Sequence, residues 1–101
     1  MRQLGTGWSN LKELTIIYGT LSDLSGLSSF SSLEYLFVSY NKIESLSDLM
    51  FHPTIRCIDL EKNKIESIEE VEYLTTMDKL EYINLNSNPL MMVKERKRKV
   101  Q

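Results

Sequence analysis

The sequence predicts an α/β solenoid of about four repeats, in which a parallel β-sheet lines the concave side and short helical or 3-10 turns cover the convex side. Two observations predict this fold. The segment Asn-Lys-Ile-Glu-Ser at positions 41–45 recurs unchanged at positions 63–67, and apolar residues recur in the same register around both copies. The composition, 42% hydrophobic and 26% charged, is typical of a chain that folds.

The period of the repeat is 22 residues. The first unit has Gly19 where the others have asparagine, and the fourth unit is displaced by 25 residues because the segment 69–79 carries three extra residues, which we expect on the convex side. The second and third units match at every apolar position and at the asparagine, pairing Leu33, Leu36, Val38, Asn41, Ile43, Leu46 and Leu49 with Ile55, Ile58, Leu60, Asn63, Ile65, Ile68 and Val71.

The spacing L-x-x-L-x-L places one short strand in each unit, and the residues after it turn the chain back, so that the strands stack in parallel. Three asparagines, Asn41, Asn63 and Asn88, follow these strands. We expect their side chains to form a ladder of hydrogen bonds with backbone groups of the turn and of the neighbouring coil, because the turn leaves those groups without partners.

The serine-rich stretch 22–32 has the composition of a flexible linker. Its apolar residues nevertheless recur at every third position, which keeps them in the register of the repeat. We therefore predict that the solenoid runs through this stretch, with Leu21, Leu24, Leu27, Phe30 and Leu33 directed inward.

Alternate strand residues must face the concave surface, because side chains switch faces at each step of a strand. Aromatic side chains on this surface either bind a partner or simply pack against one another across the sheet. We favour partner binding, because aromatic residues are common binding hot spots and Phe37 has no structural reason to point outward. The acidic residues indicate a partner with basic groups, or a solvated face. The predicted partner-binding residues are Ile17, Tyr18, Tyr35, Phe37, Tyr40, Asp59, Glu61 and Tyr82.

Few residues are candidates for chemistry. We interpret His52, the single histidine, as a turn residue between units, and Cys57 as an inert side chain at a concave strand position. The acidic residues of segment 66–72 are interpreted as a solvated convex face. Because no nucleophile, acid and base are grouped, we expect no catalytic residues, no metal, no cofactor and no enzymatic activity.

The charge distribution and the two ends of the chain limit the kinds of partner that we expect. The net charge is −2, but the basic residues after position 93 leave an acidic body, which argues against nucleic acid. No segment is long and apolar enough to cross a bilayer, so we expect a cytoplasmic protein and no membrane partner. We divide the chain into a repeat domain, 1–93, and a basic tail, 94–101, which is either a localisation signal or a solvated end. Neither end carries a cap, which suggests part of a longer chain and allows self-association through the ends.

The repeat units of this chain resemble the 22-residue leucine-rich-repeat class, of which the regulatory subunit of protein phosphatase 1 is a member. The run 33–41, followed by Ile43 and the segment 46–49, is similar to the ciliary leucine-rich-repeat protein of outer-dynein-arm assembly. The resemblance implies a scaffold in the cilium or flagellum, with dynein-arm or intraflagellar-transport components as partners. A phosphatase regulatory subunit or a nuclear leucine-rich-repeat adaptor is the alternative, and fold alone does not decide between them.

Overall fold

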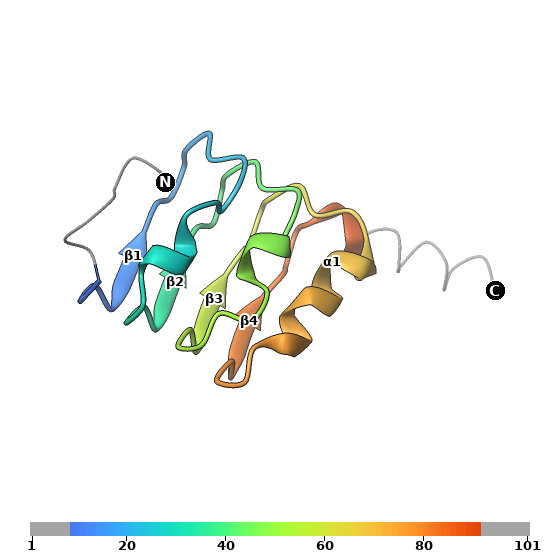
Figure 1. Cartoon of the computed structure of the whole chain (residues 1–101). Coiled ribbons are helices and arrows are strands. Elements are labelled where there is room, and N and C mark those ends of the chain that lie inside the picture. Colours follow the sequence, from blue (N-terminus) through green and yellow to red (C-terminus); the bar gives the residue numbers. More distant parts are fainter. Residues whose placement is uncertain (1–8, 92–101) are drawn as a thin grey trace.

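The computed structural model describes residues 9–91, which form one four-stranded parallel sheet with helical segments along one of its sides (Figure 1). The strands lie side by side in chain order: β1 (Glu13–Thr15), β2 (Tyr35–Phe37), β3 (Cys57–Asp59) and β4 (Tyr82–Asn84). Paired residues are 22 apart between the first three strands and 25 apart between the last two. The predicted solenoid of about four repeats is confirmed. The ends of the chain, including the predicted tail 94–101, lie outside the described residues.

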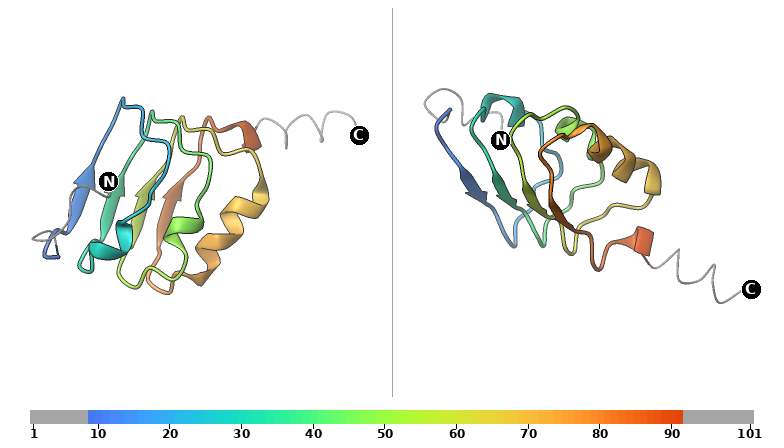
Figure 2. Two further views of the ribbon diagram at one scale, coloured as in Figure 1. Left: turned by 45° about the horizontal axis from the view of Figure 1, so that its top comes forward. Right: turned by 90° about the horizontal axis from the view of Figure 1, so that it is seen from below.

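Each connection between consecutive strands contains a short helical segment, and these segments all lie on the same side of the sheet. These segments are η2 (Leu27–Ser29), η3 (Ser47–Leu49), and the consecutive pair α1 (Ile68–Glu72) and η4 (Tyr73–Thr76). Figure 2 shows the strands as one layer and the helical segments as the other. The longer return between the third and fourth strands contains α1 and η4, so the extra residues of the sequence extend the helical layer.

The core fills the space between the two layers. The central residues of the two inner strands, Leu36 and Ile58, have no exposed surface, whereas Leu14 and Ile83 at the outer strands are partly buried. In the serine-rich stretch, Leu24, Leu27, Phe30 and Leu33 are buried. This stretch is therefore part of the packed solenoid, as its three-residue period predicts.

Asn63 shows how neighbouring repeats are joined. Its Oδ1 accepts a hydrogen bond from the N–H of Ile43 at 3.0 Å, and its Nδ2 lies within 3.3 Å of the carbonyl oxygens of Val38, Leu60 and Glu61. Two of these groups belong to the preceding repeat. The side chain is buried, so it replaces water as the partner of backbone groups that the turn would otherwise strand.

Asn41 and Asn88 repeat the same pattern. Asn41 Nδ2 donates to the carbonyl of Ile16 at 2.7 Å, and Asn88 Nδ2 donates to that of Leu60 at 2.8 Å. The hydrogen bonds expected of the three asparagines are thus present along the solenoid. The first unit has Gly19 where the others have asparagine. There is no room for a side chain at this position, because a Cβ atom added at Gly19 would lie 2.8 Å from Asn41 Oδ1.

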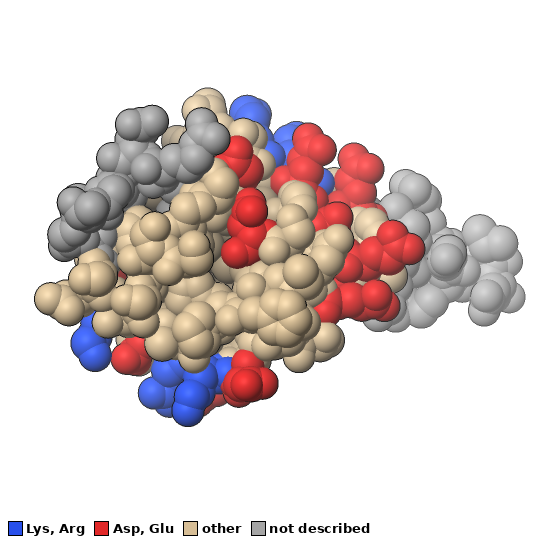
Figure 3. Space-filling view, viewed as in Figure 1, with Lys and Arg blue, Asp and Glu red and all other residues tan. Residues whose placement is uncertain are grey.

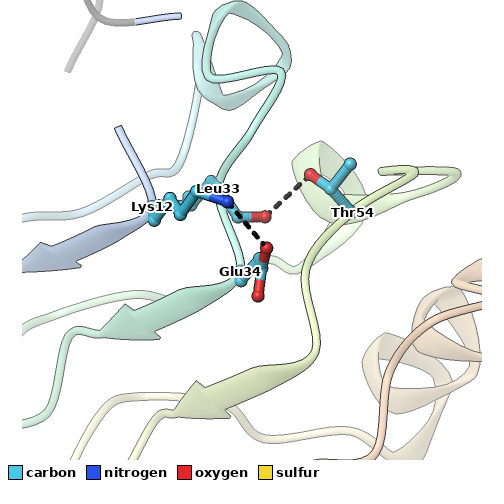
Figure 4. Close-up of polar contacts among 4 residues, drawn as sticks. All are labelled: Lys12, Leu33, Glu34 and Thr54. Atoms are coloured by element: carbon cyan, nitrogen blue, oxygen red, sulfur yellow. Dashed lines mark hydrogen bonds and ion pairs between the residues drawn. The ribbon is translucent and has the colours of Figure 1, made fainter. Parts of the chain in front are cut away.

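Further contacts join repeats at the edge of the sheet where the strands begin (Figure 4). The ammonium of Lys12 lies 3.4 Å from a carboxylate oxygen of Glu34, and the hydroxyl of Thr54 donates to the carbonyl of Leu33 at 2.7 Å. An exposed ion pair of this kind stabilises a fold by less than about 1 kcal/mol. The asparagines, which are buried, therefore contribute more to holding the repeats in register.

His52 is more than a turn residue. It lies at the bend after η3, but its ring is buried, and its Nε2 lies 3.2 Å from the carbonyl of Leu27 in the preceding repeat. The N–H of Thr54 donates to Nδ1 at 3.4 Å, so the ring is the neutral tautomer with its proton on Nε2. Burial lowers the pKa of His52. Hydrogen bonds with the backbone of Leu27 and Phe30 raise the pKa, but by less than burial lowers it.

The acidic segment on the convex side is also only partly the solvated face that the sequence predicts. Glu66, Glu69 and Glu72 are exposed, but Glu70 is half-buried. Its Oε1 accepts a hydrogen bond from the N–H of Leu46 at 2.8 Å, just before η3. One carboxylate of the segment is therefore structural, because it supplies the partner of a backbone group in the preceding repeat.

We predict that Asn63→Ala lowers the free energy of unfolding by about 1–3 kcal/mol, because it leaves buried backbone groups without partners. Chemical denaturation monitored by circular dichroism measures the difference. Asn86→Ala is the matched control, since Asn86 is exposed and its side chain makes no hydrogen bond among residues 9–91. Equal stability of Asn63→Ala and the parent protein would contradict the prediction.

We also predict that the protein loses stability as the pH falls from about 7 to about 5. The folded state depresses the pKa of His52, so the unfolded chain binds the proton more readily below about pH 6.5 and unfolding is favoured there. Protonation would also remove the Nδ1 acceptor used by Thr54. Denaturation midpoints across this range should fall less steeply for His52→Gln than for the parent; parallel slopes would exclude His52 as the cause.

Candidate protein-binding face

The outward face of the sheet, opposite the helical layer, presents two residues from each strand. We call this surface the concave face, after the predicted solenoid. The strand register aligns its residues in two rows. One row consists of Glu13, Tyr35, Cys57 and Tyr82, and the other of Thr15, Phe37, Asp59 and Asn84.

The aromatic residues of this face differ in exposure. Tyr82 is 56% exposed and Tyr35 is 39% exposed, whereas Phe37 is half-buried between Thr15 and Asp59 of the adjacent strands. Phe37 lies in an outward row, as the strand pattern predicts, but it is less exposed than Tyr35 and Tyr82 and is flanked by residues of both neighbouring strands. Tyr35 and Phe37 lie two residues apart on β2 and therefore on the same face of the sheet.

Tyr18 and Tyr40 lie beyond the ends of the strands rather than on them. Both have left-handed backbones, with φ of 60° and 61°, and their N–H groups donate to the carbonyls of Ser39 and Glu61 in the next repeat. Their rings stack with centroids 4.6 Å apart and planes tilted by 36°. Aromatic pairs of this geometry are favourable by about 0.5–1.5 kcal/mol beyond the area they bury.

The predicted residues do not form one patch. Tyr35 and Phe37 adjoin on β2, Tyr18 and Tyr40 stack at the edge where the strands end, and Tyr82 lies on β4, separated from Tyr35 by Cys57. Ile17, which the sequence also predicts to contact a partner, is 41% exposed. The candidate face is thus a strip with aromatic groups at intervals.

Two carboxylates of this face, Asp59 and Glu61, make no ion pair among residues 9–91. Asp59 Oδ1 accepts a hydrogen bond from the N–H of Glu61 at 3.1 Å, and Asn84 Nδ2 lies 3.5 Å from Glu61 Oε1. The ion pairs of the described chain, Lys12–Glu34 and Arg56–Glu81, involve neither residue. These two half-buried carboxylates therefore remain available to cationic groups of a partner.

Cys57 lies between Tyr35 and Tyr82 on the same face and is half-buried. Burial raises the pKa of its thiol, and the negative charge of Asp59 raises it further. The thiolate, which is the reactive form, is therefore scarce at neutral pH. This agrees with the interpretation of Cys57 as an inert side chain.

Three lysines were missed by the sequence analysis. Lys42, Lys62 and Lys64 line an open groove of about 550 Å³ beside the stacked tyrosines, at the edge where the strands end. The signal was present in the sequence, since each lysine is adjacent to an asparagine of the ladder. The stacking of repeats brings these positions together although they are far apart along the chain.

No group of three or more histidine, cysteine, aspartate or glutamate residues in the part of the chain from 9 to 91 is placed to hold a metal ion. Across the same residues, none of the helices has the length and apolar character needed to cross a membrane.

Stacked parallel strands, an asparagine ladder and a strand face with exposed aromatic residues define a repeat solenoid of the kind that presents an extended binding surface. A family model described as leucine rich repeat matches residues 31–90, and the chain belongs to the leucine rich repeat family. Domains of this family are typically non-catalytic modules for protein–protein interaction. No curated protein matches the sequence.

We predict that Cys57 reacts with iodoacetamide more slowly in the folded protein than in urea, because its raised pKa and partial burial limit the thiolate. Asp59→Asn should speed the folded-state reaction, since it removes the negative charge that adds to the shift. The chain has one cysteine, so mass spectrometry of the whole protein reads the rate directly. Equal rates in folded and unfolded protein would contradict this account.

Proposed function

We propose that this chain is a non-catalytic adaptor whose concave face binds a protein partner in the assembly or transport of ciliary dynein arms. The observation that carries partner binding is the exposed Tyr35 near Phe37, with Asp59 on the adjacent strand making no ion pair among residues 9–91. A rigid aromatic residue supplies a large contact area with little loss of side-chain entropy.

The chemistry of the face indicates what the partner carries. Aromatic rings and carboxylates lie side by side on it, from Tyr35 and Phe37 on β2 to Asp59 on β3 and the adjoining Glu61. A partner segment with an apolar side chain next to lysine or arginine complements both, since a ring face also attracts a cation. The strands that carry these residues are paired in register with their neighbours, which fixes the order of the side chains along the face.

The ciliary part of the proposal is supported by the similarity of the run 33–41, Ile43 and the segment 46–49 to the ciliary leucine-rich-repeat protein of outer-dynein-arm assembly. It implies dynein-arm or intraflagellar-transport components as partners and a location in the cytoplasm or cilium. A regulatory subunit of a protein phosphatase or a nuclear adaptor would use the same scaffold. The partner recovered in the experiment below distinguishes these alternatives.

We predict that the double variant Tyr35→Ala/Phe37→Ala loses its partner. The protein and the variant are used as baits in an extract of ciliated cells, and the bound proteins are identified by mass spectrometry. Dynein-arm or intraflagellar-transport components should be recovered with the parent and reduced at least about tenfold with the variant, which corresponds to the loss of about 1.4 kcal/mol.

Phe51→Ala is the matched control, because Phe51 is an exposed aromatic residue on the loop after η3, away from the concave face. Since Phe37 is half-buried, the variants are compared for stability before use, and binding is measured well below their melting temperatures. Recovery of a phosphatase catalytic subunit would overturn the ciliary proposal. Equal recovery of the same partner by both baits would overturn the assignment of Tyr35 and Phe37.

A further inference from the structure

The groove beside the stacked tyrosines differs in charge from the rest of the described chain. Residues 9–91 contain 13 acidic residues and 6 lysines or arginines. Three of those six, Lys42, Lys62 and Lys64, line this one groove. Figure 3 shows basic side chains at the upper and the lower edges of the molecule, with acidic side chains next to the upper group and over the helical face.

The three lysines have no ion-pair partner within residues 9–91. By contrast, two basic residues at the opposite edge of the sheet are in ion pairs: Lys12 with Glu34, and Arg56 with Glu81. Lys64 also borders a smaller hollow lined by Glu44, Glu66 and Glu70, so its charge is partly offset. Lys42 and Lys62 are exposed, and only their backbone N–H groups make hydrogen bonds in the described chain, to Leu21 and Asn86.

The stacked rings of Tyr18 and Tyr40 form an aromatic wall of the same groove. Tyr18 is 77% exposed, although a ring of this size is usually covered in a packed domain. The ring pair offers an apolar surface for one side chain, and the lysines offer charge for carboxylates around it. The groove therefore combines two different kinds of contact within reach of one extended segment.

The occupant must be anionic, and the surrounding charge argues for a peptide. A nucleic acid needs a basic surface along its whole phosphate backbone, whereas this groove is a local basic area on an acidic domain. A volume of about 550 Å³ falls within the range of roughly 300–1,000 Å³ typical of ligand sites, and an open groove suits an extended chain.

We propose that this groove binds an acidic peptide segment of the protein partner, with carboxylates at Lys42 and Lys62 and an aromatic side chain against Tyr18 and Tyr40. The inference rests on the proposed function, because the groove adjoins the concave face and extends it past the ends of the strands. The partner then carries basic groups where it crosses Asp59 and Glu61, and acidic groups where it passes the lysines.

The test uses a short fluorescein-labelled peptide in which glutamates flank one phenylalanine, titrated with the full chain and monitored by fluorescence anisotropy. The peptide should bind, more weakly at high salt, and Lys42→Gln/Lys62→Gln should weaken its binding on the order of tenfold. Lys12→Gln/Lys79→Gln is the matched control, since it removes the same charge outside the groove and should leave peptide affinity within about twofold.

Two further arms separate the outcomes. Replacing the glutamates of the peptide by glutamine should abolish binding, and Tyr35→Ala/Phe37→Ala should leave the affinity for the peptide unchanged. No peptide binding, equal loss with both lysine pairs, or tighter binding of a single-stranded oligonucleotide than of the peptide would overturn the groove. Those results would leave the concave face in place, because its own test depends on capture of the partner by the strand residues.

Discussion

The buried asparagines that follow β2, β3 and β4 are the constraint on which the rest of the structure depends. Each side chain bonds backbone groups of two successive repeats, as Asn63 does with Val38 and Ile43. Because an amide reaches these groups only when the turns lie directly over one another, the asparagines fix the spacing of the repeats. The register of the strands, and hence the rows of side chains on the concave face, follows from that spacing.

The same stacking produces the two candidate surfaces. Strand residues 22 positions apart become neighbours, which places Asp59 beside Phe37 and Tyr35 beside Cys57. Tyr18 and Tyr40 have left-handed backbones just before Gly19 and Asn41. Their side chains lie against each other at the edge of the sheet. A domain that is acidic as a whole thereby presents an aromatic and acidic face next to a basic groove.

The fold was predictable because a repeat encodes its packing locally. The period of 22 residues located the first three strands and the apolar spacing located the fourth, while the three-residue spacing of Leu24, Leu27 and Phe30 distinguished a packed turn from a linker. The candidate site was less predictable, because exposure depends on neighbours from other repeats. Phe37 is half-buried between two neighbouring strands, and His52 and Glu70 bond to groups more than 20 residues away. The lysine groove was missed for the same reason: its residues converge only when the repeats stack.

The central claim is that the ladder builds a rigid face for protein binding on the strands. The most direct measurement is two-dimensional NMR of the ¹⁵N-labelled chain, titrated with the partner recovered from cell extract. The account predicts that backbone amide shifts change in β1, β2, β3 and β4 and at Tyr18 and Tyr40, with α1 and η4 unaffected. Changes confined to α1, η4 and the other helical segments, with the strands unchanged, would contradict it.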